Sequence, residues 1–174
     1  MREKVSADAI EQFMRGLGRA ARTSARIYFV GGVSAVLLGW RETTIDIDLK
    51  LVPEANEILK ALPDLKERLH VNVELASPDD FIPPLPGWEE RSSFIAREGE
   101  IDFFHYDFYA QALAKIERGH NTDLLDVRRM IERGHVEPSR LMEFFSRIED
   151  QMYKYPAIDV KSFRNAVEQF VNSL

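Results

Sequence analysis

The stretch over residues 28–50, YFVGGVSAVLLGWRETTIDIDLK, constrains this chain more than any other. Its pattern predicts an apolar strand, a turn at Gly31 and Gly32, a short helix over 33–39 and a second strand over 44–51. A glycine pair between a strand and a helix can expose backbone N–H groups at the helix N-terminus, where an anion is favoured. The stretch therefore predicts a turn that can bind phosphate.

Two carboxylates follow on the second predicted strand. Because side chains alternate along a strand, Asp46 and Asp48 are expected on one face, about 7 Å apart, with Ile45, Ile47 and Leu49 on the other. Mg²⁺ typically binds one or two carboxylates together with phosphate oxygens and water. An acidic pair alone is typical of a solvated edge strand, and a glycine pair alone of an ordinary turn. Their combination at this spacing favours a site for a metal and a phosphate.

This region resembles the nucleotidyltransferase superfamily, which has a DNA-polymerase-β-like fold. The residues that carry the resemblance are Gly31-Gly32, Ser34, Arg41, Thr44 and Asp46-Ile-Asp48. The chain looks most like the branch that contains the nucleotidyltransferase toxins of abortive-infection toxin–antitoxin systems and their uncharacterised relatives. That branch carries a motif K-x-x-R-x-x-x-K-D-x-x-D-L. The matching segment is Lys115-Ile-Glu-Arg118-Gly-His-Asn-Thr122-Asp123-Leu-Leu-Asp126-Val127, in which Thr122 replaces the internal lysine and Val127 the leucine.

The resemblance implies a metal-dependent transfer of a nucleotidyl group from an NTP, with Mg²⁺ or Mn²⁺ as cofactor. The implied catalytic residues are Asp46, Asp48, Lys115 and Asp123, the implied nucleotide contacts are Gly31, Gly32, Ser34, Arg41 and Arg118, and the implied metal ligands are Asp46, Asp48 and Glu74. The third carboxylate stays open between Glu74, on a strand predicted over 71–75, and Asp102, on a strand predicted over 101–104.

Two of these residues also have purely structural interpretations. Arg41 can pair with Glu42 or another nearby carboxylate instead of a phosphate. Asp123 can complement the dipole at the start of the helix that follows the break at 119–121, where Asn121 or Thr122 is the predicted cap.

The resemblance leaves the acceptor open between an RNA, such as a tRNA 3′ end, and a protein hydroxyl. It also implies an antitoxin as a possible partner. The alternative function is a catalytically weak or inactive module of the same fold that binds a nucleotide or a partner. Thr122, at the position of the lysine in the motif, favours this alternative.

The composition is that of an ordinary globular protein, with 174 residues, 45% hydrophobic and 30% charged. We expect an α+β nucleotidyltransferase fold, with a mixed twisted sheet flanked by helices over 1–135 and a C-terminal helical pair over 136–174. The net charge of −6 argues against binding nucleic acid over a broad surface. The chain has no cysteine and no apolar run near 18 residues, so we expect a cytoplasmic protein without a membrane span.

The other predicted elements follow from apolar periodicity. Helices are expected over 6–24, 54–62, 106–117, 138–153 and 159–172, and a hairpin over 92–97 and 100–105. Ser6 is the predicted cap of the first helix, whose Arg15, Arg19 and Arg22 form a stripe that is either solvated or phosphate-facing. The proline-rich segment 77–88 is expected to form a stiff loop that either walls one side of the cleft or only packs Phe81, Ile82 and Trp88 over the sheet edge. The two C-terminal helices either complete the core or offer an apolar face to another chain.

Overall fold

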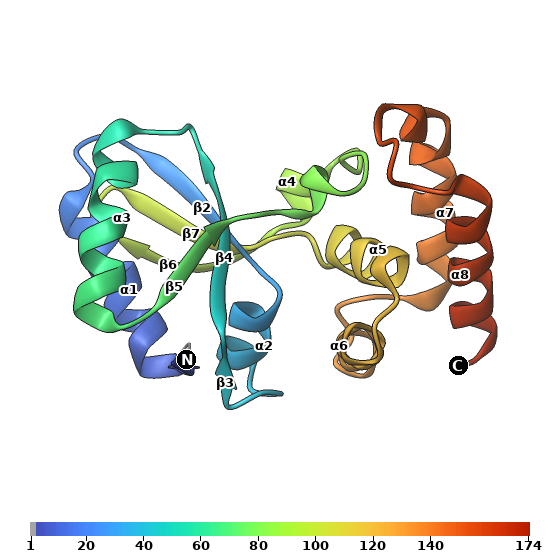
Figure 1. The fold of residues 1–174 in the computed structure, drawn as a ribbon, viewed down its shortest axis with the longest axis horizontal. Coiled ribbons are helices and arrows are strands. Elements are labelled where there is room, and N and C mark those ends of the chain that lie inside the picture. The colour runs from blue at the N-terminus through green and yellow to red at the C-terminus, as the bar shows by residue number, and fades with distance from the viewer. Residues whose placement is uncertain (1–2) are drawn as a thin grey trace. The chain divides into compact units, whose positions relative to one another are not determined.

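A computed structural model describes residues 3–174, and their elements group into two compact units (Figure 1). The sheet unit contains the described residues up to Ser77 together with Ser92–Tyr106. The helical unit contains Pro78–Arg91 together with Asp107–Leu174. The boundary expected near residue 135 stays a prediction. Within residues 3–174, no helix has both the length and the apolar character needed to cross a membrane.

The sheet unit carries the mixed sheet that the fold class predicts. In chain order its elements are β1 (Val5–Ser6), α1 (Ala7–Ala20), β2 (Ala25–Val30), α2 (Gly32–Leu38), β3 (Thr43–Thr44), β4 (Asp46–Val52), α3 (Asn56–Leu69), β5 (Asn72–Leu75), β6 (Ser93–Glu98) and β7 (Ile101–His105). Among the described residues, five strands form one sheet in the order β5-β4-β2-β7-β6, and β1 and β3 form a separate antiparallel pair. β2 is antiparallel to β4 and parallel to β7, while β5 is parallel to β4 and β6 antiparallel to β7.

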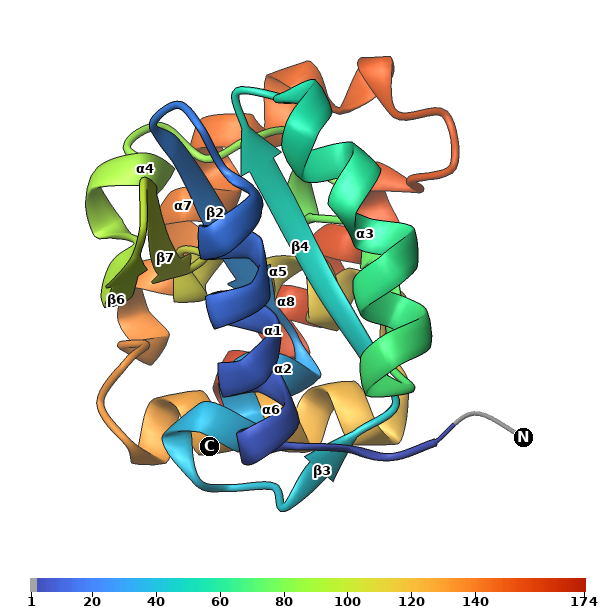
Figure 2. The ribbon, with the colours of Figure 1, turned by 90° about the vertical axis from the view of Figure 1, so that its left-hand side faces the viewer.

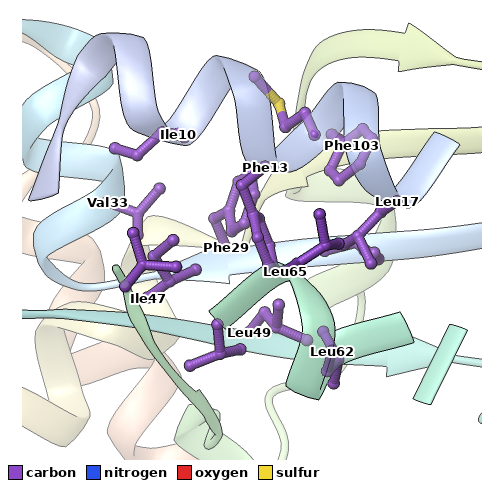
Figure 3. Close-up of a cluster of buried hydrophobic side chains, with 14 of the residues drawn as sticks. Ile10, Phe13, Leu17, Phe29, Val33, Ile47, Leu49, Leu62, Leu65 and Phe103 are labelled. Atoms are coloured by element: carbon purple, nitrogen blue, oxygen red, sulfur yellow. The ribbon is translucent and has the colours of Figure 1, made fainter. Parts of the chain in front are cut away.

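Helices α1 and α3 cover one face of this sheet (Figure 2). Their apolar side chains meet those of the strands in one buried cluster, drawn in Figure 3, which includes Ile10, Phe13, Leu17, Phe29, Val33, Ile47, Leu49, Leu62, Leu65 and Phe103. The apolar spacing of α1 was predicted, and its start is confirmed because the Ser6 hydroxyl accepts a hydrogen bond from the backbone N–H of Ala9 at 3.3 Å. Alternation along β4 is also confirmed, since Ile47 and Leu49 are buried in this cluster.

The prediction for Ile45 is wrong. The expected continuous strand is split into β3 and β4, and Ile45 lies between them with 43% of its surface exposed. The reason is that β3 pairs with β1 rather than with the five-stranded sheet, so the backbone changes direction before Asp46.

Helix α3 is longer than predicted. The helix predicted over 54–62 ends at Leu62, whereas the observed helix continues through Pro63 to Leu69. Pro63 cannot donate a backbone hydrogen bond inside the helix. The extension buries Leu65 against the sheet, and this apolar burial offsets the cost of the proline.

The helical unit contains the remaining elements. In chain order they are η1 (Pro78–Asp80), α4 (Trp88–Arg91), α5 (Phe108–Arg118), α6 (Asn121–Glu132), α7 (Pro138–Ile148), η2 (Glu149–Lys154) and α8 (Val160–Asn172). α5 packs against α6, α7 and α8, and α7 packs against α8. The buried side chains of α7 and α8 include Leu141, Phe144, Phe145, Phe163, Val167 and Phe170. The C-terminal helices therefore complete the core of this unit.

Two further expectations differ from the structure of this unit. The segment Pro78–Arg91 belongs to the helical unit, where the Tyr155 hydroxyl donates to the Asp79 carbonyl at 2.9 Å, and Phe81 is exposed rather than packed. α6 begins at Asn121, and the residue before it, His120, makes no side-chain capping bond, so neither predicted residue caps this helix.

Candidate active site

The Gly31-Gly32 turn joins β2 to α2, as predicted. Gly31 has a φ of 64°, which favours glycine, and a Cβ placed on it would lie 3.7 Å from Oδ2 of Asp48. A Cβ on Gly32 would lie 2.0 Å from Oγ1 of Thr44 and 3.5 Å from Nη1 of Arg41. The turn therefore needs glycine at both positions, and the structure brings Asp48, Thr44 and Arg41 against it.

The second acidic strand lies directly beside the first. β5 pairs with β4 in register, so Asn72 is opposite Asp46 and Glu74 is opposite Asp48. Paired residues of neighbouring strands point to the same face, which places all four side chains together. The amide Nδ2 of Asn72 donates to Oδ1 of Asp46 at 2.7 Å and to Oε1 of Glu74 at 3.2 Å.

Asp102 lies elsewhere on the sheet. Its register partner on β2 is Arg26, which is opposite Val52 at the far end of β4 from Asp46. Nη1 of Arg97 donates to both carboxylate oxygens of Asp102 at 3.2 Å. Of the two candidates for a third carboxylate, Glu74 is therefore the one beside the acidic pair.

The donor set at Asp46 and Asp48 fits Mg²⁺ as a pair. Mg²⁺ binds one or two carboxylates when phosphate oxygens and water complete its coordination. In the part of the chain that the structure describes, no group of three or more His, Cys, Asp or Glu side chains is arranged to hold a metal. Glu74 therefore neighbours the pair without completing a three-carboxylate cluster.

Ser34 occupies a position that the sequence did not suggest. The residue is fully buried, and its hydroxyl lies 2.7 Å from Nδ1 of His105 on β7. This hydrogen bond ties α2 to the end of β7 inside the sheet unit. A phosphate contact from the Ser34 hydroxyl would require that bond to rearrange.

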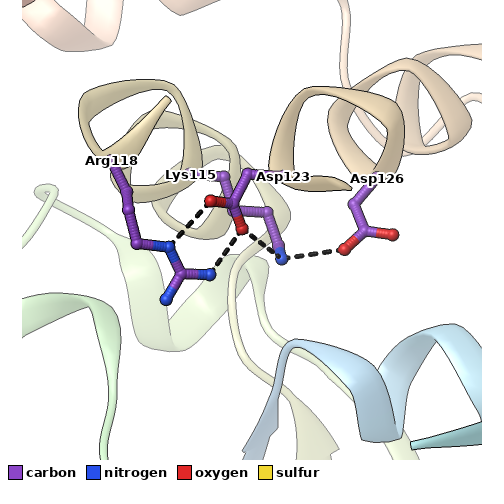
Figure 4. A network of polar contacts seen from close by, with 4 residues as sticks. All are labelled: Lys115, Arg118, Asp123 and Asp126. Atoms are coloured by element: carbon purple, nitrogen blue, oxygen red, sulfur yellow. Dashed lines mark hydrogen bonds and ion pairs between the residues drawn. The ribbon is translucent and has the colours of Figure 1, made fainter. Parts of the chain in front are cut away.

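The predicted charged residues of the helical unit form a compact network between α5 and α6 (Figure 4). Nε and Nη2 of Arg118 donate to Oδ2 and Oδ1 of Asp123, at 2.7 and 2.5 Å. Nζ of Lys115 lies 2.9 Å from Oδ2 of Asp126 and 3.6 Å from Oδ1 of Asp123. The predicted Lys115–Asp123 ion pair is therefore present, but the shorter contact of Lys115 is to Asp126.

Three of the four side chains of this network are largely shielded from solvent. Both carboxylates are buried, the Lys115 side chain is 11% exposed, and the Arg118 side chain is 61% exposed. Burial raises the pKa of the Asp123 carboxyl, but the hydrogen bonds from Arg118 and the charge of Lys115 outweigh it, so the pKa lies below its ordinary value. The ionised form of Asp123 is thus favoured by the fold.

Sequence reasoning missed two residues of the candidate site, Asn72 and His105. It also missed that Lys115 makes its shorter contact with Asp126. Asn72 had a usable signal, because it lies two residues before Glu74 on an alternating strand and so shares its face. His105 had no local signal, because its bond to Ser34 joins segments far apart in the chain.

The mixed sheet with its covering helices, and the glycine turn that faces an Asp-x-Asp strand, are consistent with a nucleotidyltransferase fold. Residues 8–174 match the model of a family described as a nucleotidyltransferase of unknown function (DUF6036), and the chain belongs to that family. No curated protein and no solved structure matches the chain. The family description names a class of enzyme and no substrate.

Proposed function

We propose that the chain binds an NTP with a divalent metal and transfers its nucleotidyl group to an acceptor hydroxyl. The observation that carries this proposal is the approach of the Asp48 carboxylate to the turn at Gly31, 3.7 Å from the position of a Cβ on that glycine. A side chain on Gly31 would stand between the backbone of the turn and the carboxylate. Without that side chain, the backbone of the turn directly faces a carboxylate that we propose as a metal ligand.

In this proposal Asp46 and Asp48 hold Mg²⁺ or Mn²⁺. When bound, the metal would offset negative charge on the triphosphate oxygens. Asn72 keeps Asp46 oriented through its 2.7 Å hydrogen bond. The backbone N–H groups of the glycine turn and the guanidinium of Arg41 bind phosphate oxygens. Lys115 and Arg118 have the same role by resemblance, with Asp123 orienting Lys115.

The proposed transfer is a substitution at the α-phosphorus of the NTP. The acceptor oxygen forms a bond to the α-phosphorus, and the bond from the α-phosphorus to its bridging oxygen breaks. Pyrophosphate leaves with that electron pair. Glu74, opposite Asp48 in the β4–β5 register, accepts the proton of the acceptor hydroxyl.

A second candidate function is nucleotide binding without catalysis. The observation that favours it is that, among residues 3–174, no three metal-binding side chains of the His, Cys, Asp and Glu types cluster together. A site with two carboxylates can hold Mg·NTP without activating an acceptor. The toxin-type role and an antitoxin partner remain proposals from resemblance to that branch.

Calorimetry tests the nucleotide site. Each NTP is titrated with and without Mg²⁺ into wild type, into the Asp46→Asn, Asp48→Asn double variant, and into Asp64→Asn, whose carboxylate lies on the exposed side of α3. We expect wild type and Asp64→Asn to bind at least one NTP more tightly with Mg²⁺, and the double variant to lose this metal dependence. If wild type binds no NTP in the presence of Mg²⁺, the proposed function is wrong.

Catalysis is tested separately from binding. Wild type is incubated with cell extract and an NTP labelled at the α-phosphate, and label is followed into RNA and into protein. Label that enters either fraction, and fails to do so with the double variant, supports the transferase. Mg·NTP binding without any labelling supports the binding module.

A further inference from the structure

The acidic residues share one face of the sheet with a row of aromatic rings. Asp48 is opposite Val30 on β2, and Tyr28, two residues earlier on β2, points to the same face. Tyr28 is opposite Phe104 on β7, which is opposite Phe94 on β6. The centroids of Tyr28 and Phe104 are 5.2 Å apart in a stacked arrangement, and those of Phe104 and Phe94 are 5.8 Å apart, edge to face.

This row is accessible at its β6 end. Tyr28 is buried and supports Phe104, which is half-buried, while Phe94 is 60% exposed. A two-residue step along a strand is roughly 7 Å, so the aromatic row lies one such step from Asp48 along the strands. Phe94 lies three strands across from Asp48, roughly 14 Å at the usual strand spacing.

Cations lie within and beyond the aromatic row on the same face. Lys50 is opposite Tyr28 within the row. One step further from Asp48, Arg26 and Arg97 both lie opposite Asp102, and Arg97 also lies 3.7 Å from Glu100. Three cations thus accompany two carboxylates here, whereas the row of Asp48 and Glu74 is acidic. Along this face the acidic row therefore gives way, across the aromatic rings, to a region in which the cations exceed the carboxylates by one.

We infer that this face binds a single-stranded polynucleotide as the acceptor, an inference that rests on the proposed function. Exposed rings stack with bases of any sequence, and neighbouring cations attract the phosphates. In this inference Phe94 and Phe104 stack with bases, Lys50 and Arg26 bind backbone phosphates, and the terminal hydroxyl lies at the acidic row. The net charge of −6 confines such binding to a local patch.

A polypeptide fits this arrangement less well. A peptide acceptor needs no row of flat apolar rings between a metal site and a set of cations. A nucleotide chain carries a base, a phosphate and a terminal hydroxyl in a fixed covalent order, and the three rows of this face offer partners for each of them.

Fluorescence anisotropy with a short, end-labelled single-stranded RNA, and DNA of the same sequence, tests this surface. Phe94→Ala is expected to weaken binding of the preferred strand by roughly 5- to 100-fold, while Phe94→Tyr keeps most of it. Phe81→Ala is the matched control, because Phe81 is a similarly exposed phenylalanine, 55% exposed, in the helical unit. Arg26→Gln is expected to lower the salt dependence of log K by about 0.7 for one lost phosphate contact.

Several outcomes would overturn the inference. They are the absence of binding to either strand, an equal loss in Phe81→Ala and Phe94→Ala, and label from NTP that enters protein and not nucleic acid. Calorimetry with Mg·NTP distinguishes failure of the proposed function from failure of the polynucleotide inference. Wild type that binds Mg·NTP but no polynucleotide leaves the proposed function standing and removes this inference. Polynucleotide binding without Mg·NTP binding removes the proposed function instead, and the surface is then a nucleic-acid site without transfer.

Discussion

At Gly32 the requirement for glycine comes from a close approach and not from an unusual backbone angle. Thr44 on β3 lies where a Cβ on Gly32 would be, with Oγ1 at 2.0 Å and its own Cβ at 2.7 Å. This contact fixes the turn against the connection that carries Arg41. The acidic strand begins two residues after Thr44, so a change at Gly32 also disturbs the start of β4.

Gly32→Ala is expected to lower the free energy of unfolding by about 1–3 kcal/mol, because the added methyl group overlaps Thr44. Thr44→Gly removes both overlapping atoms, so the Gly32→Ala change should cost much less in that background. Urea unfolding of the two single variants and the double variant measures this coupling. Equal costs of Gly32→Ala in both backgrounds would show that Thr44 is not the cause.

The lowered pKa of the Asp123 carboxyl leads to a prediction of how the free energy of unfolding depends on pH. Its folded-state pKa lies below the ordinary value because hydrogen bonds from Arg118 and the charge of Lys115 outweigh the opposite effect of burial. A carboxyl with a lowered folded pKa adds stability that is complete above its unfolded value, near 3.9, and is lost as pH falls through the folded value. Stability should therefore fall as the pH drops below about 4.

Urea unfolding between neutral pH and pH 3 tests this. Arg118→Met, which removes the hydrogen bonds, should show a smaller loss of stability below pH 4 than wild type. Arg147→Met is a control, because Arg147 pairs with the exposed Glu143 on the surface of α7. The two variants should differ in the size of the acid-dependent loss, and equal profiles would contradict a role for Asp123.

At the scale of elements, helix α3 shows tertiary packing prevailing over a local helix breaker. Pro63 lacks the N–H that would donate to the carbonyl of Leu59, yet the helix runs on for six more residues to Leu69. Leu62 and Leu65, on either side of the proline, are both in the buried cluster. The proline itself is exposed, so its ring contributes little to that cluster.

Pro63→Ala is therefore expected to stabilise the chain by roughly 1–3 kcal/mol, because it restores a helical hydrogen bond and removes a steric conflict. Pro138→Ala is the matched control. Pro138 is at the start of α7, where proline suits the helix, so no gain is expected there. Thermal unfolding of both variants gives the comparison, and a Pro63→Ala protein that melts at or below wild type would refute the prediction.

Strand pairing is the other element-scale result. Glu74 and Asp102 both lie on strands in which apolar and polar residues alternate. The sequences of these two strands do not indicate which of them pairs with β4. The order β5-β4-β2-β7-β6 places Glu74 next to Asp48 and puts two strand spacings between β4 and the strand of Asp102. Because β5 and not β7 pairs with β4, Glu74 and not Asp102 lies beside Asp46 and Asp48.

For the whole molecule, the chain passes between its two units three times, after Ser77, Arg91 and Tyr106. The excursion Pro78–Arg91 is held in the helical unit by the Tyr155–Asp79 hydrogen bond and by the Arg91–Asp107 ion pair at 2.7 Å. A proline-rich segment between two strands looks locally like a loop of the sheet. Only its contacts assign it to the helices.

The sequence by itself determined the Gly31-Gly32 turn, the alternation of Asp46 and Asp48 with buried residues, and most of the amphipathic helices. These features depend on near neighbours, because the side-chain periods of strands and helices are local properties of the backbone. Tertiary structure decided that Glu74 neighbours Asp48, that Asn72 holds Asp46, that Ser34 bonds His105 and that α3 passes through Pro63. Each of those depends on segments distant in the chain, whose pairing and burial are set by the energy of the whole fold.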